Sequence, residues 1–348
     1  MAVTVHILDP LSDSRWEELT ARHSGASVFH QRAWLESSKK TFGYDPFVLT
    51  TSPGRPLRNG IVFYRVSSWL TGKRLVSLPF SDHCEPLLSD ASEFGEFANW
   101  LCAECDRQRY RYVEIRPRSE FNTGDSNLQP AQSYWFHELD LEPALPVLFG
   151  RLHKNSFQRK IQRAERERLN YEIGRSARLL DELYGLLLMT RKRHGLLPHP
   201  RTWFKNLVEC MGDKVEIRLA RKKDGTAIAA MLTLRHRSRV VYKYGGSDKQ
   251  FHALGGMPFL FWRLIEESKA AGVGKIDLGR SDLDQRGLVV FKDRLGTMRE
   301  LRTYYRYTNA ARKLKSRPWE SQSFREAFCR LPDSLLSASS RLLYKHMG

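Results

Sequence analysis

Two aspartates and a lysine in the last quarter of the sequence are residue types that acid–base and electrostatic chemistry requires. Asp277 lies within the expected strand KIDLG, Asp282 lies just after it, and Lys292 follows in the run VVFKDRLG. Such a carboxylate could orient or deprotonate an attacking group, and a lysine ammonium could hold a phosphate or neutralise an oxyanion. A carboxylate between apolar strand neighbours also needs a partner, which Arg280 or Lys292 could supply. A purely structural ion pair is therefore the alternative.

Two tyrosines on an expected strand are further candidates. Tyr242 and Tyr244 alternate with Lys243 in the run YKYGGSD, so regular strand geometry would project both tyrosines to the same side. Their hydroxyls could donate a hydrogen bond to a carbonyl or protonate a leaving group. Aromatic pairs on strands also pack in protein cores, and that interpretation stays open.

A pair of glycines precedes the helix pattern that follows this strand. Gly255 and Gly256 stand directly before MPFLFWRLIEE. Free backbone N–H groups at the start of a helix bind phosphate, and glycines allow a ligand to approach closely. Turn geometry alone would also explain the pair. With Tyr242 and Arg280, these glycines are the residues that we expect to hold a phosphate-bearing cofactor.

A polar loop in the first half of the chain is a candidate for substrate binding. Ser81, Asp82 and His83 follow the expected strand LVSLPF and precede Cys84. Adjacent residues on an extended chain point apart, and a nucleophile also needs a base that a third group orients. We therefore interpret the loop as one that recognises substrate, rather than as a Cys–His nucleophile.

Positive charge is concentrated in two segments. Arg159 lies in the basic stretch 151–168, which predicts either a solvated helix face or a rim that faces phosphate. His194 follows the cations at 191–193 at an expected helix end, where cations complement the helix dipole and could also guide an anionic substrate. We count Arg159 and His194 among the substrate-binding candidates. No helix-turn-helix, zinc-finger or RNA-recognition signature accompanies them, so nucleic acid is a minor alternative.

The composition is that of a folded, basic protein. The chain of 348 residues carries 57 Lys+Arg against 39 Asp+Glu, a formal net charge of +18, and is 41% hydrophobic. This excludes disorder as the dominant state, and no stretch approaches the roughly 20 apolar residues that span a membrane. The N-terminus shows no secretory pattern. The odd number of cysteines suits reduced thiols, and Cys102 and Cys105 lack a second ligand pair, so we expect a cytoplasmic protein without a metal.

Two segments repeat the same order of elements. Residues 27–117 and 199–282 each predict a helix, three strands, a second helix and a final strand. Trp34 and Trp100 in the first segment match Trp203 and Trp262 in the second at nearly equal separations. The first three strands are close enough for antiparallel hairpins, and the helical crossover implies a parallel fourth strand. The predicted fold class is α+β, with a mixed, mostly antiparallel sheet flanked by helices, and no GxGxxG or GxxxxGK[ST] motif favours a nucleotide-binding fold of another class.

Several runs in a fixed order carry a resemblance to a known family. They lie at 70–88, 161–173 and 186–204, followed by YKYGGSD (242–248), KIDLGRSD (275–282) and VVFKDRLG (289–296). As a set they resemble the Fem-type peptidyltransferase and Gcn5-related (GNAT-like) N-acyltransferase family, particularly bacterial members associated with exopolysaccharide and protein-sorting systems. The resemblance covers residues 25–308. It implies two tandem GNAT-like subdomains and transfer of an acyl or aminoacyl group to an amine of a cell-envelope or polysaccharide precursor.

The resemblance also implies a donor and a reacting centre. It implies acyl-CoA as the donor, with its phosphates near Gly255 and Gly256, its acyl carbonyl near Tyr244, and Lys292 and Asp277 beside the attacked carbon. The acetyl-CoA loop (Q/R)xxGx(G/A) is absent, the nearest stretch being QFHALGG at 250–256. The turn KDGT replaces the long helical hairpin of members that use aminoacyl-tRNA. Aminoacyl-tRNA as donor, and an inactive binding subunit of a polysaccharide assembly complex, are the alternatives.

The expected domains end in a basic tail. They are an N-terminal subdomain (1–150), a basic connecting helix (151–174), a donor-binding subdomain (175–309) and the tail (310–348). In the tail, Trp319, Phe324, Phe328 and Leu331 recur at helical intervals among basic residues. This amphipathic pattern predicts either docking on an anionic membrane surface or an apolar stripe packed on the body.

Overall fold

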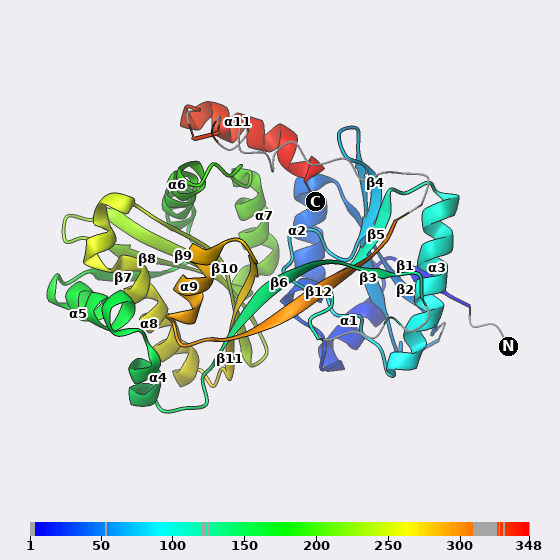
Figure 1. Cartoon of the computed structure of the whole chain (residues 1–348), viewed down its shortest axis with the longest axis horizontal. Helices are drawn as coiled ribbons and strands as arrows, with labels where there is room; N and C mark the ends of the chain where they lie inside the picture. Colours follow the sequence, from blue (N-terminus) through cyan, green and yellow to red (C-terminus); the bar gives the residue numbers. More distant parts are fainter. Residues whose placement is uncertain are drawn as a thin grey trace. The chain divides into compact units, whose positions relative to one another are not determined.

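The computed structural model describes residues 4–52, 54–119, 123, 126–308, 326, 328–329 and 331–347. The described residues form two compact units (Figure 1). Unit 1 takes its residues from Met1–Ser133, Arg302–Ser316 and Arg341–Gly348, and unit 2 takes its residues from Tyr134–Leu301 and Arg317–Ser340. The domain ranges expected from the sequence stay a prediction.

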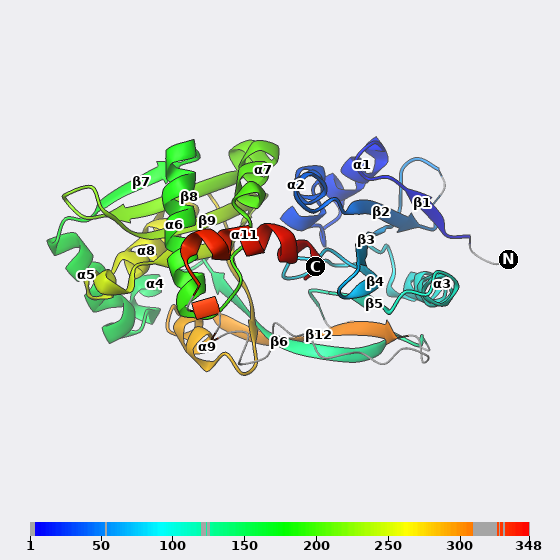
Figure 2. The same cartoon turned by 90° about the horizontal axis from the view of Figure 1, so that it is seen from above.

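Unit 1 contains a mixed sheet with helices on both faces (Figure 2). Its strands are hydrogen-bonded in the order β1-β2-β3-β4-β5-β12. Their bounds are β1 His6–Leu8, β2 Asp45–Thr50, β3 Ile61–Ser68, β4 Gly72–Val76, β5 Tyr112–Ile115 and β12 Met298–Thr308, of which the C-terminal part lies in this unit. The helices are α1 Ser14–Arg22, α2 Arg32–Phe42 and α3 Phe94–Arg107.

Unit 2 is built on the same plan. Its strand order is β6-β11-β10-β9-β8-β7, with β6 Gln129–Asp140, β7 Asn170–Gly174, β8 Val215–Arg221, β9 Ala227–His236, β10 Arg239–Ser247 and β11 Lys275–Asp282. Its helices include α4 Leu145–Arg151, α5 Arg159–Arg166, α6 Ala177–Arg193, α7 Arg201–Met211, α8 Gly256–Ala270 and α9 Arg286–Asp293. Helices α6 and α7 cover one face of the sheet, and α8 with α5 covers the other (Figures 1 and 2).

The predicted repeat and fold class are confirmed. In both units the three strands after the first helix pair antiparallel, and the strand after the crossover helix pairs parallel with the third: β5 with β4, and β11 with β10. The last strands, β6 and β12, were missing from the prediction. β6 follows β5 in the chain but pairs with β11 of unit 2, and β12 pairs with β5 of unit 1.

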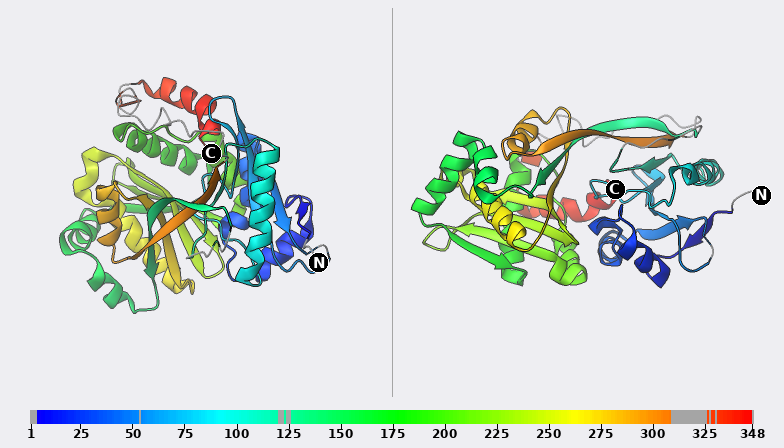
Figure 3. Two further views of the ribbon diagram at one scale, coloured as in Figure 1. Left: turned by 45° about the vertical axis from the view of Figure 1, so that its right-hand side comes forward. Right: turned by 90° about the horizontal axis from the view of Figure 1, so that it is seen from below.

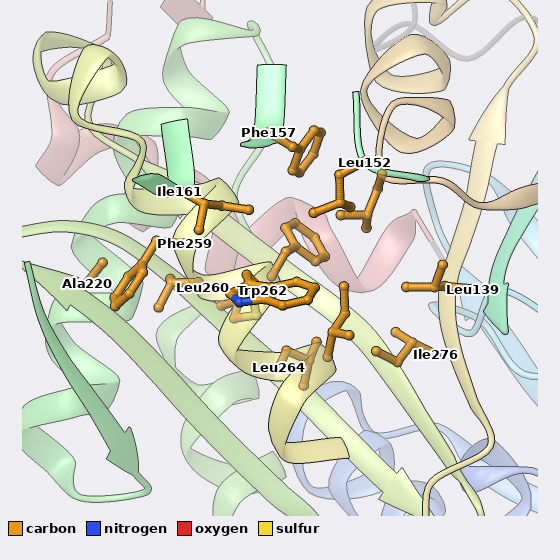
Figure 4. Packing of buried hydrophobic residues seen from close by; sticks show 14 of the residues in the cluster. Leu139, Leu152, Phe157, Ile161, Ala220, Phe259, Leu260, Trp262, Leu264 and Ile276 are labelled. Atoms are coloured by element: carbon orange, nitrogen blue, oxygen red, sulfur yellow. The ribbon is translucent and has the colours of Figure 1, made fainter. Parts of the chain in front are cut away.

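The core of unit 2 lies between α8 and the sheet. Figure 4 shows Leu260, Trp262 and Leu264 of α8 among apolar side chains from β6, β11 and α5. Phe157 and Ile161 cover this layer from the segment before and within α5, and both are almost fully buried. This packing holds α5 against the start of α8. Both segments line the cavity described below, so the packing also sets the distance between these two parts of its wall.

Part of the expected tail lies within the described residues. Helix α11 (Asp333–Leu343) runs beside α6 within unit 2, where Lys192 Nζ lies 2.8 Å from Asp333 Oδ1 and Tyr184 Oη lies 3.3 Å from Ser337 Oγ (Figure 3). Leu336 is fully buried, whereas Leu335 is 55% exposed. Trp319 and Phe324 lie outside the described residues, so the predicted membrane contact of the tail stays a prediction. Within the described part of the chain, no helix combines the length and apolar character that crossing a membrane requires.

Candidate functional site: a cationic cavity in unit 2

A cavity of about 840 Å³ lies within unit 2. The segments that line it include β9, β10, the residues between β10 and α8, the start of α8, the end of α6, α9 and the first turn of α5. Its lining includes Ser156, Lys160, Thr190, Arg191, Arg193, His194, Leu196, Ile228, Ala229, Tyr242, Gly245, Gly246, Ser247, Phe251, His252, Gly256, Met257, Pro258, Gln285, Gly287, Leu288, Val290, Phe291 and Arg294. The volume falls within the range of about 300 to 1,000 Å³ that is typical of small-molecule sites.

The cavity opens where β10 and β11 stop pairing. The parallel register between them runs only from Arg239 opposite Lys275 to Val241 opposite Asp277. Immediately after this point β10 has a bulge between Tyr242 and Tyr244. The residues beyond it, Gly245 to Ser247, line the cavity together with Tyr242. The divergence of two parallel neighbours thus makes room for a ligand beside β10.

Lys292 and Asp277 hold the divergent part of β11. Lys292 Nζ donates to the carbonyl oxygens of Gly279 and Arg280, both at 3.0 Å, and Asp277 Oδ1 accepts from the N–H of Gly279 at 2.7 Å. Gly279 has φ of 67°, and the register of β11 against β6 shifts between Asp277 and Arg280. Lys292 is 3% exposed and Asp277 is 7% exposed. Both residues therefore stabilise an irregular backbone through buried, charge-assisted hydrogen bonds.

The two tyrosines do not project to the same place, contrary to the prediction from strand alternation. Tyr242 lines the cavity, and its ring packs 4.8 Å from that of Phe261 on α8. Tyr244 packs instead against Phe204 of α7, and its hydroxyl accepts from Trp203 Nε1 at 2.8 Å. The bulge between them is the physical reason, because an extra residue reverses the side on which the following side chains emerge.

The glycine pair has a structural explanation in addition to the ligand interpretation. Gly255 has φ of 78° and precedes α8, and a Cβ there would overlap the carbonyl oxygen of Lys160. Gly256 lines the cavity, and a Cβ there would lie 3.0 Å from that of Ala229. Pro258 has no N–H, so Gly256 and Met257 supply the N–H groups of the first turn of α8. These groups and the helix dipole favour an anion at this end of the cavity.

The charged side chains of the described lining are cationic. Lys160, Arg191, Arg193 and Arg294 line the cavity with His194 and His252, and the described lining contains no Asp or Glu. Burial lowers the pKa of His194, and Arg193 and Arg191 lower it further. Burial lowers the pKa of His252 too, with Arg193 and Lys160 as the next causes. The two imidazoles are consequently neutral near pH 7, and the field of the cavity selects anions.

The guanidinium of Arg191 lies beside the buried imidazole of His199. His199 Nδ1 lies 3.4 Å from an Nη atom of Arg191, and the imidazole packs against the rings of Tyr244 and Phe204. Burial, with Arg191 and Lys243 as further causes, holds the pKa of His199 well below its usual value. The neutral ring can accept from the guanidinium, which limits the orientations of Arg191. The sequence predicts that the cations at 191–193 complement a helix dipole and could also guide an anionic substrate. It predicts no individual role for Arg294 or for Lys160, which lies in the basic stretch 151–168, although both line the cavity.

The other predicted site residues lie outside this lining. Asp282 ends β11 and accepts from Gln285 Nε2 at 2.7 Å. Arg280 stacks over the ring of Tyr134, and Arg159 is exposed at the start of α5. The structure therefore brings Tyr242, Gly256 and His194 to one cavity, with Gly255 directly beside it.

The predicted recognition loop belongs to unit 1. Ser81 and His83 are 1% and 2% exposed, and the backbone carbonyl of Asp82 accepts from the hydroxyl of Tyr304. The Ser81 hydroxyl donates to the carbonyl oxygen of Leu78 at 2.6 Å. Leu78 has φ of 57°, so the loop contains a backbone conformation that is costly for a leucine. The role of the loop in substrate binding stays a prediction.

Cys84 lies beside His30 in unit 1, with Sγ 3.5 Å from Nε2. The thiol is fully buried, and burial raises its pKa well above its usual value, so it stays protonated. We expect iodoacetamide to alkylate the exposed Cys329 and to leave Cys84 unmodified in the folded protein, as peptide mass mapping would show. Alkylation of Cys84 at the rate of Cys329 would contradict this protonated, buried state.

The predicted packing role of the CxxC pair agrees with the structure. Cys102 and Cys105 are both buried in α3, and Cys105 belongs to the core of unit 1. Across the described residues, no group of three or more His, Cys, Asp or Glu has an arrangement that could hold a metal ion.

Comparisons with known proteins agree with this architecture. Residues 151–292 match the family model described as "Acetyltransferase (GNAT) domain". A comparison of the sequence with curated proteins finds no match. Among solved structures, FemX is similar with a TM-score of 0.64 and 13% identity, over 88% of this chain and 98% of that chain. The C-terminal domain of a putative lysylphosphatidylglycerol synthetase from Agrobacterium fabrum has a TM-score of 0.55 and 13% identity, over 86% and 92% of the chains.

A tandem GNAT protein from the clavulanic acid biosynthesis pathway is also similar, with a TM-score of 0.53 and 11% identity over 88% of this chain and 98% of that one. These similarities place the chain among proteins with a GNAT-like fold. The described residues have a tandem GNAT-like α+β fold, which agrees with the match of residues 151–292 to the GNAT domain model and with the similarity of the chain to FemX and to the tandem GNAT protein.

Proposed function

We propose that the protein is an N-acyltransferase that moves an acyl group from acyl-CoA to an amine by direct attack. The observation that supports this most is the cavity, which joins cationic side chains, the start of α8 and the part of β10 that no longer pairs with β11 in one small-molecule site. A thioester donor with several phosphates suits a cavity with this charge. The proposed acceptor is an amine of a cell-envelope or polysaccharide precursor, recognised with the help of residues 81–83. We propose the cytoplasm as the location, since acyl-CoA and reduced thiols both belong there.

The proposed reaction needs one proton to leave the amine and one to reach the sulfur. The amine nitrogen bonds to the acyl carbon, the carbon–sulfur bond breaks, and the thiolate takes up a proton. Burial raises the pKa of Tyr242, so its hydroxyl keeps its proton and can donate to the carbonyl oxygen or to the sulfur. His194, neutral because its pKa is lowered, can accept the proton of the amine directly or through water.

Aminoacyl-tRNA is the second candidate donor, and the net charge of +18 is the observation that favours it. The turn between β8 and β9 spans only Lys222 to Thr226, so the helical hairpin that the resemblance associates with tRNA-dependent members does not occur there. We therefore place acyl-CoA first. An inactive binding subunit is the third possibility, and it predicts neither donor binding nor transfer.

The deciding experiment is a mass-spectrometric screen of acyl-CoA donors against amino-sugar and amino-acid acceptors, with CoA binding measured by calorimetry. Transfer with CoA binding supports the proposal. If the protein does not bind CoA but binds aminoacyl-tRNA, and that binding weakens steeply with salt, then aminoacyl-tRNA is the donor instead of acyl-CoA. If neither donor binds, the proposal that the protein is an enzyme is wrong, and the inactive binding subunit is the remaining alternative.

Replacing one cation of the cavity should weaken CoA binding measurably. We expect Lys160→Gln to raise the dissociation constant of CoA about tenfold, because a hydrogen bond to a charged group contributes about 1.5 kcal/mol or more. Lys223→Gln is the matched control, because Lys223 is exposed in the β8–β9 turn and lies outside the cavity lining. Equal affinities of the two variants would show that Lys160 does not contact the donor.

A further inference from the structure

The hairpin that joins β3 and β4 in unit 1 exposes two apolar side chains at its tip. Trp69 is 82% exposed and Leu70 is 38% exposed. The turn is nevertheless ordered by hydrogen bonds, since Ser68 Oγ accepts from the N–H groups of Leu70 and Thr71 at 3.2 and 2.9 Å. Ser68 itself is buried. These hydrogen bonds define the conformation of the turn, in which the Trp69 side chain is exposed to solvent.

Residues 341–347 pack against the base of the same hairpin. The carbonyl oxygen of His346 accepts from Thr71 Oγ1 and from Arg74 Nη2, both at 3.0 Å, and His346 Nδ1 lies 2.9 Å from Ser68 Oγ. The ring of His346 meets that of Trp69 edge to face at 5.4 Å. Leu342, four residues earlier in the chain, is 69% exposed. The segment that packs against the hairpin therefore carries an exposed apolar side chain of its own.

The charged residues of the two segments that form this surface are all cationic. Segments 67–74 and 341–347 contain Lys73, Arg74, Arg341 and Lys345 and no Asp or Glu. Lys73, Arg341 and Lys345 are exposed, and Arg74 is buried under His346. Tryptophan and leucine beside lysine and arginine are the side chains that meet the boundary between lipid headgroups and acyl chains.

We propose that this surface, the hairpin patch (Trp69, Leu70, Lys73, Leu342 and Lys345), docks unit 1 on an anionic lipid bilayer. The tip inserts Trp69 and Leu70 at the headgroup boundary, and the lysines attract the anionic lipids. A projecting turn with adjacent apolar side chains suits insertion into a bilayer. Proteins that bind single-stranded nucleic acid use a positively charged groove instead, so nucleic acid is the less suitable partner. The proposal is independent of the donor that the cavity of unit 2 takes.

Co-sedimentation of the full chain with vesicles tests the proposal. We expect binding to phosphatidylcholine vesicles that contain phosphatidylglycerol, little binding to phosphatidylcholine alone, and weaker binding at high salt. Trp69→Ser/Leu70→Ser should reduce partitioning roughly tenfold, because both inserted side chains are lost. Ile7→Ser is the control, since Ile7 is 51% exposed on β1 of the same unit.

Two further measurements separate insertion from other kinds of binding. Lys73→Glu should weaken partitioning about fivefold or more, given about 1 kcal/mol per basic residue, whereas Arg58→Glu at another exposed position of unit 1 should have a smaller effect. Brominated lipid should quench the fluorescence of the wild type more than that of Trp69→Phe. Equal sedimentation of Trp69→Ser/Leu70→Ser and wild type would overturn the proposal. So would tRNA binding that depends on Trp69 in the absence of vesicle binding.

Discussion

Replacing Lys292 by methionine is expected to weaken CoA binding at least tenfold and to lower the free energy of unfolding by about 3 kcal/mol. Methionine keeps most of the length of the side chain but removes the ammonium that donates to the carbonyl oxygens of Gly279 and Arg280. Those two acceptors would stay buried without that donor, and the irregular part of β11 would lose its support. Since the cavity opens where β11 leaves β10, we infer that Lys292 positions the donor site by holding this backbone.

Lys269→Met is the matched control for this prediction. Lys269 Nζ also donates to two backbone carbonyls, those of Leu141 and Glu142 at 2.8 and 3.0 Å, but near the opposite end of α8 from the cavity. Loss of stability without loss of CoA affinity is expected there. The comparison also separates positioning from catalysis. If Lys292→Met retains CoA affinity while kcat falls, Lys292 acts on the reacting atoms and the positioning role is wrong.

Replacing Gly255 by alanine is expected to destabilise the fold by about 3 kcal/mol or more and to abolish CoA binding. The left-handed backbone at φ of 78° costs about 1 kcal/mol or more for alanine, and the added Cβ would overlap the carbonyl oxygen of Lys160. Either α5 or the start of α8 would have to move, and Lys160 and Gly256 both line the cavity. Urea unfolding and calorimetry with CoA measure the two effects.

Gly185→Ala provides the control in the same unit. Gly185 lies within α6, and a Cβ there would meet no atom within 4 Å. Alanine is favoured over glycine inside a helix, so this variant is expected to gain about 0.5 to 1 kcal/mol and to bind CoA as the wild type does. If Gly255→Ala is as stable as Gly185→Ala and binds CoA as tightly, then neither the backbone nor the packing requires glycine at 255.

The order of elements could be predicted because it depends on neighbours in the sequence. Alternating apolar residues predicted the hairpin strands of both segments, and the helix pattern around Trp262 predicted the crossover that makes β11 parallel to β10. The glycines before α8 were found for the same reason, since a left-handed residue at the start of a helix is a local feature. Of the candidate residues, Tyr242, Gly256 and His194 lie in the cavity lining, with Gly255 beside it.

The pairing of β6 with β11, and of β12 with β5, could not be predicted in this way. The first four residues of each strand are exposed, and many of the others are half-buried, so the alternation of apolar and polar residues is weak. Their pairing partners, β11 and β5, are more than a hundred residues away in the chain. The bulge between Tyr242 and Tyr244 likewise depends on β9, and it reversed the expected direction of Tyr244.

The sequence by itself determined the α+β class, the repeated order of elements and the basic character of the chain, since composition and local periodicity fix these. Only the tertiary structure decided which cations meet at one cavity and that Lys292 and Asp277 bind the backbone of β11. The physical reason is that side-chain hydrogen bonds and charge clusters form between residues that folding brings together from distant segments. Lys160, Arg191 and Arg294 come from three such segments, and no spacing along the chain records their proximity.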